Sequence, residues 1–280
     1  MYPILIDAFD HRLVLYAAET GLRLGVLAAI FLGPRWAESL AGVDRRQARR
    51  AMIVLALVFL VGARLHFVLN HSGVYVGRWH QALVLWGGGF HLPGGMIALV
   101  LAAPTVCRRL GIDVGRFGDG ITPSLGVGIA FARLGCFLQS CCFGAICHQP
   151  WCMSFPKDSL PQVIHARQEL IAATAPSLPV HPLQLYFLAA GLSITAVAFW
   201  LHPRRRYDGQ VALVGLFLYS ASSAALEFFR ADYYPRTYWG PLPQLAWTAF
   251  AMTLVSLVAL VVAELAHRRR AAVSPAALPA

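Results

Sequence analysis

Residues 244–266 read QLAWTAFAMTLVSLVALVVAELA, and this stretch decides the class of protein. It holds a single charged residue, Glu264, and is long enough to cross the hydrocarbon core of a bilayer as one helix. Six further apolar stretches precede it. The chain is 58% hydrophobic and only 13% charged, whereas a soluble domain carries about 25% charged residues. The sequence therefore predicts an all-α integral membrane protein.

The seven predicted transmembrane helices share an apolar composition and a membrane-spanning length. They cover roughly residues 13–33, 51–70, 82–104, 118–138, 182–201, 210–229 and 244–266. The first stretch contains Glu19 and Arg23 and lacks the basic region and small-residue cleavage site of a signal peptide. We therefore expect it to be retained as the first helix.

The basic residues predict the orientation of these helices. Fourteen of the 23 lie in alternate loops and after the last span. These are Arg35, Arg45, Arg46, Arg49, Arg50, Arg108, Arg109, Arg116, Arg204, Arg205, Arg206, Arg268, Arg269 and Arg270. The positive-inside rule places these loops and the C-terminus in the cytoplasm and the N-terminus outside. This placement accounts for the formal charge of +10, and the sequence holds no nucleic-acid-binding motif.

We interpret residues 1–280 as a single membrane domain with an outside segment at about 139–180, of periplasmic type, and a short flexible C-terminal tail at 271–280. The outside segment carries the only lysine, Lys157, and most of the cysteines. Disulfides form on that side of a membrane, and a bridge between Cys147 and Cys152 fits there. A retinal-binding protein is excluded, because no span offers a lysine for a Schiff base.

Ionisable residues within the spans point to a function, because such groups usually face a bundle interior or a cavity. They are Glu19, Arg23, Arg64, Asp119, Arg133, Glu227 and Arg230. Glu19 and Arg23, four residues apart, form either a self-neutralising pair or part of a site. Guanidinium groups match phosphate with a two-pronged geometry, and lipid phosphate is the abundant anion at headgroup depth. Inward arginines therefore predict a lipid-handling membrane protein.

Two of the ten histidines lie beside residues that bend the backbone. His91 follows a glycine run in WGGGFHLPGGM, and His181 precedes a proline in VHPLQLYF. Non-helical backbone at membrane depth usually lines a cavity, where a neutral histidine can act as a base. His66, His80 and His202 lie at predicted helix ends and are interpreted as structural.

Four motifs occur in an order that resembles the bacterial prolipoprotein diacylglyceryl transferase family. They are GDGITPSLGVGIAFARLGCF (118–137), GAICHQPWCMSFP (144–156), HPLQLYF (181–187) and EFFRAD (227–232). The resemblance extends from about Tyr16 to about Gln244. It implies transfer of a diacylglyceryl group from phosphatidylglycerol to the lipobox cysteine thiol of a prolipoprotein. The product is a thioether, glycerol phosphate is released, and the location is the bacterial cytoplasmic (inner) membrane.

The resemblance also implies roles for particular residues. Arg133 corresponds to the phosphate-binding arginine, assisted by Arg230, which Glu227 orients. His91, or else His181, helps to generate the acceptor thiolate. The remaining implied lipid- or phosphate-site residues are Asp119, Tyr16, Gln184, Tyr186, Gly135 and Gly144. No metal and no cofactor are expected, and the expected partners are phosphatidylglycerol, the prolipoprotein cysteine and membrane lipids.

Several positions depart from the family pattern. Ala132, Cys136 and Cys141 replace a glycine, an asparagine and an acidic residue of the signature. Ser223 stands where the family has an arginine, and two residues separate His91 from the glycine pair that normally follows it. Arg64 or Arg23 is a candidate for the missing charge. These departures keep open a second hypothesis, a catalytically diverged lipid-binding membrane paralogue.

Five of the six cysteines fall within residues 136–152. Their spacing matches no common zinc motif. A membrane thiol oxidoreductase that passes electrons to a quinone is a third hypothesis, although the C-x-x-C form typical of such proteins is missing. Close helix packing by small apolar side chains is the simplest interpretation of Cys136 and Cys142.

Overall fold

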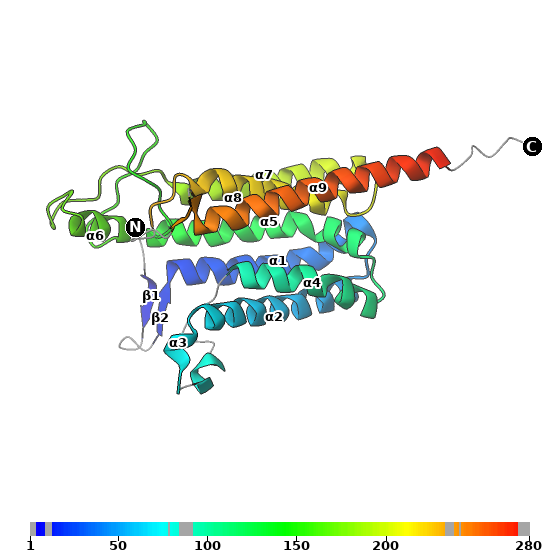
Figure 1. Cartoon of the computed structure of the whole chain (residues 1–280), viewed down its shortest axis with the longest axis horizontal. Coiled ribbons are helices and arrows are strands. Elements are labelled where there is room, and N and C mark those ends of the chain that lie inside the picture. Colours follow the sequence, from blue (N-terminus) through cyan, green and yellow to red (C-terminus); the bar gives the residue numbers. More distant parts are fainter. Residues whose placement is uncertain are drawn as a thin grey trace, which may run out of the picture. The chain divides into compact units, whose positions relative to one another are not determined.

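The computed structural model of the chain describes residues 4–8, 13–77, 79–83, 92–232, 238–240 and 242–273. The helices are α1 (Ala17–Ala41), α2 (Arg45–Asn70), α3 (Ser72–Tyr75), η1 (Trp79–Leu83), α4 (Leu92–Arg109), α5 (Val114–Gln139), α6 (Leu160–Arg167), α7 (Leu183–Leu201), η2 (His202–Arg204), α8 (Gln210–Glu227) and α9 (Gln244–Val273). Two short hairpins pair β1 (Ile4–Ala8) with β2 (Leu13–Tyr16) and β3 (Tyr238–Trp239) with β4 (Leu242–Pro243). The predicted helical membrane architecture is confirmed, with the hairpins as an addition (Figure 1).

Among the described residues, six helices are long and apolar enough to cross a membrane. They are Ala17–Ala41, Arg45–Leu69, Val114–Gln139, Leu183–Arg204, Gln210–Glu227 and Ala246–Ala271. The prediction that the first span begins at residue 13 is wrong, because Leu13 pairs with Ala8 in a hairpin and the helix begins at Ala17. The predicted third span, 82–104, corresponds in part to α4, and residues 84–91 lie outside the described residues.

The helices belong to two compact units, 32–121 and a larger one formed by 1–31 with 122–280. In the unit 32–121, α2 packs on α4. A Cβ atom on Gly62 would lie 2.7 Å from the carbonyl oxygen of Gly94, so glycine is needed where these helices touch. Asp44 caps α2 by accepting a hydrogen bond from the Gln47 amide at 2.9 Å. Gly42 ends α1 with a φ of +66°, a conformation that favours glycine.

In the larger unit, α8 packs against both α7 and α9, and the three helices run side by side in Figure 1. The end of α5 approaches the start of α1 closely, because Gly21 and Gly135 face each other. A Cβ atom on Gly21 would lie 2.6 Å from the Cα of Gly135. The amide of Ala18 also donates to the Gln139 side chain at 2.8 Å. Small residues thus allow the backbones to touch, as is common between membrane helices.

The segment between α5 and α7, residues 140–182, contains one helix, α6, and otherwise consists of turns and extended stretches joined by isolated β-bridges. Phe143, Phe155 and Val180 are fully buried and form a small core of their own. Isolated β-bridges join Val180 to Ile146 and to Met153. A further bridge joins Gly144 to Arg230, just after α8. The 140–182 segment is therefore tied to the end of α8 by backbone hydrogen bonds.

The helix surfaces agree with a lipid environment. Only 6% of the apolar window of α9 is buried, and Leu254 and Val255 are more than 60% exposed. Exposed apolar surface of this extent is unfavourable in water and is expected to contact the acyl chains of a bilayer.

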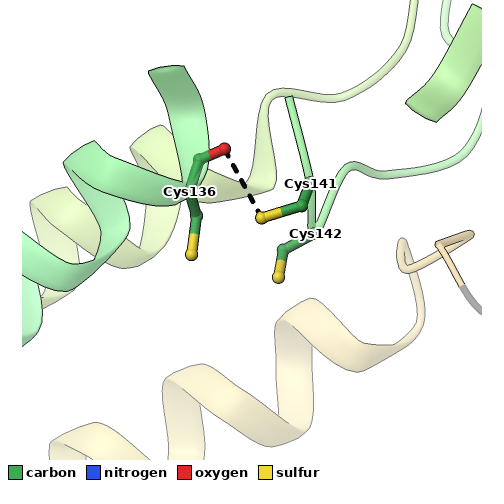
Figure 2. Close-up of side chains that lie close together, drawn as sticks. All are labelled: Cys136, Cys141 and Cys142. Carbon is green, nitrogen blue, oxygen red and sulfur yellow. Dashed lines mark hydrogen bonds between the residues drawn. The ribbon is translucent and has the colours of Figure 1, made fainter. Parts of the chain in front are cut away.

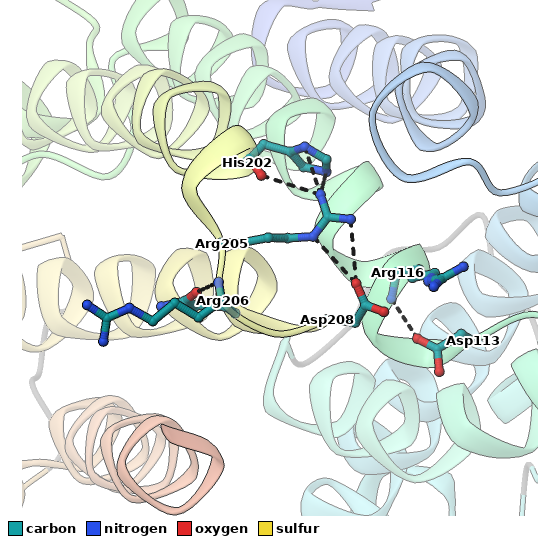
Figure 3. A network of polar contacts seen from close by, with 7 residues as sticks. Asp113, Arg116, His202, Arg205, Arg206 and Asp208 are labelled. Atoms are coloured by element: carbon teal, nitrogen blue, oxygen red, sulfur yellow. Dashed lines mark hydrogen bonds and ion pairs between the residues drawn. The ribbon is translucent and has the colours of Figure 1, made fainter. Parts of the chain in front are cut away.

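Basic residues between α7 and α8 are organised by ion pairs (Figure 3). Arg205 contacts the His202 ring nitrogen at 2.9 Å and the Asp208 carboxylate at 3.5 Å. Arg206 bonds Glu264 of α9 at 2.8 Å. In the unit 32–121, the Asp113 carboxylate accepts from the Arg116 amide at 2.8 Å and caps α5.

Candidate functional site

Arg133 lies in the penultimate turn of α5 and is half-buried. Its guanidinium carbon lies 4.3 Å from the ring centroid of Phe187, a buried side chain in the first turns of α7. A cation–π contact does not use the N–H groups of the guanidinium as hydrogen-bond donors. Arg133 can therefore still donate to an anion such as a phosphate.

Arg230 lies just after α8 and forms a second cationic group. Its Nε and Nη2 atoms donate to the two oxygens of Asp232 at 2.7 and 3.2 Å. Glu227, the partner expected from the sequence, contacts Arg230 at 3.8 Å. The side chains are only 13%, 9% and 7% exposed, respectively. Asp232 is thus the closer of the two carboxylates. The sequence does not predict this pair, because residues two apart do not face each other on a helix.

The charges of both arginines affect the pKa of one thiol, that of Cys142. Hydrogen bonds with the Cys136 and Cys141 thiols, together with the positive charges of Arg230 and Arg133, lower the pKa of Cys142. Burial opposes this effect. Two contacts place the arginines near this turn: Arg230 is bridged to Gly144, two residues after Cys142, and Arg133 lies one helical turn before Cys136 on α5.

Gly144 holds this region to α7. Its amide donates to the His181 carbonyl at 2.9 Å, and the His181 amide donates to Ala145 at 3.0 Å. A Cβ atom on Gly144 would lie 2.6 Å from the His181 Cβ and 2.8 Å from the Phe229 carbonyl oxygen. A glycine is required here because the backbones on both sides are in contact with it.

Gln184 on α7 is fully buried and fixes the turn after α5. Its amide nitrogen donates to the Cys141 carbonyl at 2.6 Å. Its side-chain oxygen is buried without a hydrogen-bond partner among the described residues. Gln184 thus has a positioning role and one unsatisfied acceptor.

An open pocket of about 770 Å³ lies beside His181. The residues that line it are Ile146, Cys147, His148, Gln149, Trp151, His181, Tyr186 and Phe229. His181 Nδ1 lies 3.2 Å from the Tyr186 hydroxyl oxygen. Cys147 and Cys152 form a disulfide, as predicted, and its sulfur atoms lie within 4.8 Å of a His181 ring nitrogen. The pocket is thus lined by an imidazole and aromatic rings, and the Cys147–Cys152 disulfide crosslinks part of its wall.

The remaining predicted site residues have other described environments. Tyr16 ends β2 and is 43% exposed, and Gly135 packs α5 against α1. Asp119 is fully buried and belongs to the unit 32–121. His91 lies outside the described residues.

The two arginines suggested for the missing charge are both engaged. Arg23 bonds Glu19 at 2.7 Å on the exposed surface of α1. Arg64 donates to the carbonyl oxygens of Ala82 and Gln81 at 2.9 and 3.0 Å. Arg64 therefore ties α2 to η1 within the unit 32–121.

Together these features define a helical membrane protein with buried and half-buried arginines near the ends of α5 and α8. Residues 3–262 match the family described as prolipoprotein diacylglyceryl transferase. The chain belongs to this family of transferases.

Relatives named phosphatidylglycerol--prolipoprotein diacylglyceryl transferase are similar along most of their length. The protein from Bordetella avium is 30% identical over 202 residues, 71% of this chain and 70% of the relative. That from Azotobacter vinelandii is 29% identical over 248 residues, 84% and 83% of the two chains. That from Clostridium tetani is 24% identical over 243 residues, 83% and 86% of the two chains.

Proposed function

We propose that this protein transfers a diacylglyceryl group from phosphatidylglycerol to the lipobox cysteine thiol of a prolipoprotein. The observation that carries the proposal is the position of two arginines in a membrane protein of this family: Arg133 lies near the end of α5, and Arg230 is bridged to Gly144 in the segment that follows α5. The names of its relatives supply the two substrates. The site in this chain supplies the groups that recognise a lipid phosphate.

The arginines are proposed to bind the lipid phosphate and to stabilise the leaving glycerol phosphate. Arg133 makes a cation–π contact with Phe187, and Arg230 donates hydrogen bonds to Asp232. Both guanidinium groups are therefore positioned before the lipid binds. Preorganised donors of this kind stabilise charge that develops in the transition state without having to reorganise. The transfer needs no metal ion and no cofactor in this scheme.

The chemical step forms one bond and breaks one bond. The acceptor thiol loses its proton to a base, and the thiolate attacks the glyceryl carbon that carries the phosphate. A C–S bond forms, the C–O bond breaks, and its electron pair leaves with the glycerol phosphate. We assign the base to His181, which Tyr186 orients within the pocket, or to His91, as the family resemblance suggests.

The proposal includes the arrangement in the membrane. Seven spans, an outside N-terminus and a cytoplasmic C-terminus place the 140–182 segment and its disulfide on the outer side of the bacterial inner membrane. The arginine-rich connection between α7 and α8 then faces the cytoplasm. The chain is proposed to work as a single membrane domain.

One observation favours a second candidate, a lipid-binding paralogue without transfer activity. Ser223 lies on α8, one turn before Glu227, where the resemblance predicts an arginine. A site with two arginines is sufficient to bind a phosphate, whereas transfer also requires stabilisation of the leaving group. The two candidates differ in product formation and agree in lipid binding.

The test is transfer in vitro. Purified protein in detergent receives phosphatidylglycerol and a lipobox peptide, and mass spectrometry follows the peptide. We expect a diacylglyceryl mass gain that Arg133→Ala abolishes and Arg133→Lys partly restores. Arg23→Ala is the matched control, because that arginine is exposed and paired with Glu19. No mass gain by wild-type protein that still binds the lipid would refute transfer and support the paralogue.

A further inference from the structure

Three free cysteines gather where α5 ends (Figure 2). Cys136 lies in the last turn of α5, and Cys141 and Cys142 lie in the turn that follows. The three sulfur atoms lie within 4.8 Å of one another, and all three residues are half-buried. Their spacing along the sequence resembles no metal motif, because the turn rather than the helix brings them together.

The turn adopts a strained backbone conformation to do so. Ser140 and Cys142 have φ values of +62° and +58°, in the left-handed region that non-glycine residues rarely adopt. Each such residue costs about 1 kcal/mol or more, and strain of this kind is concentrated at functional sites. The conformation folds Cys141 and Cys142 back over Cys136.

Hydrogen bonds hold this conformation in place. The amides of Ser140 and Cys141 donate to Phe137 and Cys136 at 3.1 Å each. The Cys141 thiol also points toward the Cys136 carbonyl, 3.7 Å away. The buried Gln184 amide fixes the Cys141 carbonyl from α7. The three sulfurs are therefore held in position before any ligand binds.

Cysteine binds a metal ion as the thiolate, so binding would release the thiol protons. A metal ion with bonds of about 2.3 Å holds its sulfur ligands about 3.8 Å apart, within the separation found here. Half-exposure leaves a route for the ion to enter.

We propose that Cys136, Cys141 and Cys142 form a three-thiolate site for a soft, closed-shell metal ion, Cu⁺ or Zn²⁺. Thiolates select these ions over harder ones. Cu⁺ is satisfied by three sulfur ligands, whereas Zn²⁺ would require a fourth ligand such as water. The ion plays no part in the proposed transfer, and its binding does not depend on that function.

The test titrates the full-length protein in detergent under anaerobic, reducing conditions. A Cys147→Ala/Cys152→Ala background prevents reduction from freeing a second cysteine pair. Competition with chromophoric chelators measures the uptake of Cu⁺ and of Zn²⁺ in separate arms. We expect one ion per chain and at least a tenfold loss of affinity in Cys142→Ser. Cys107→Ser is the matched control, because Cys107 is free, fully buried and part of the unit 32–121.

A second measurement needs no variant in the trio. In the same background protein, bound metal is expected to protect Cys136, Cys141 and Cys142 from alkylation, as located by peptide mass mapping. Uptake that is unchanged when all three are replaced by serine would overturn the proposal. So would failure of both ions to bind or to protect.

Discussion

Replacing Gly144 by alanine is predicted to disable the site from a distance. The added Cβ would lie 2.6, 2.8 and 2.9 Å from the His181 Cβ, the Phe229 carbonyl oxygen and the His181 carbonyl oxygen. Two of these neighbours are backbone atoms that cannot rotate away, so the backbone at Gly144 must move away from His181 and Phe229. Overpacking of this kind costs about 1–3 kcal/mol, and a displacement of catalytic groups by about 1 Å can cost about a hundredfold in rate.

The assay pairs transfer to the lipobox peptide with thermal unfolding in detergent. Gly144→Ala is expected to lower the transfer rate roughly a hundredfold and to lower the melting temperature by several degrees. Gly73→Ala is the matched control, because a Cβ atom there would meet nothing within 4 Å and the φ of Gly73 is ordinary. Equal rates and equal melting temperatures for the two variants would refute the proposed role of the Gly144 contact.

Three further predictions concern the surroundings of the site. Asp232→Asn keeps one side-chain oxygen but removes the negative charge beside the buried Arg230 and is expected to destabilise the protein by about 3 kcal/mol; a melting temperature within one degree of wild type would contradict this. Reduction of the Cys147–Cys152 disulfide, which closes a short loop, is expected to remove about 2 kcal/mol and to speed proteolysis of the 140–182 segment, and unchanged cleavage would count against it. Burial lowers the pKa of His165 from its ordinary value of 6.5, so the unfolded state protonates first and stability is lost as the pH falls below 6.5. Hydrogen-exchange protection factors of the 140–182 segment, which are corrected for the intrinsic rate at each pH, should fall there in wild type, and an equal fall in His165→Gln would refute this cause.

The membrane helices were predictable because their signal is local. Apolar composition over a membrane-spanning length identifies α2 or α9 without knowledge of any contact. The same signal misplaced the start of α1, because residues 13–16 are also apolar. Their pairing with β1 depends on a hairpin partner that hydropathy does not register.

Candidate site residues could be selected from the sequence only where the residue type is unusual for its position. Arg133 and Arg230 were found because buried arginines in a membrane protein require an explanation. Asp232 and Phe187 were missed, because their contacts with these arginines arise from the ends of α8 and α7 rather than from sequence spacing. The cysteine cluster was missed for a similar reason, since two left-handed residues in the turn create it.

The most direct test of the central claim is the product stoichiometry of wild-type protein. Phosphatidylglycerol with a labelled headgroup and a lipobox peptide are incubated with the enzyme, and both products are quantified by mass spectrometry. The account predicts one glycerol phosphate released for each diacylglyceryl group gained by the peptide, and no gain by a peptide whose cysteine is replaced by serine. Peptide that gains only single acyl groups, or that gains nothing while the lipid stays intact, would contradict it.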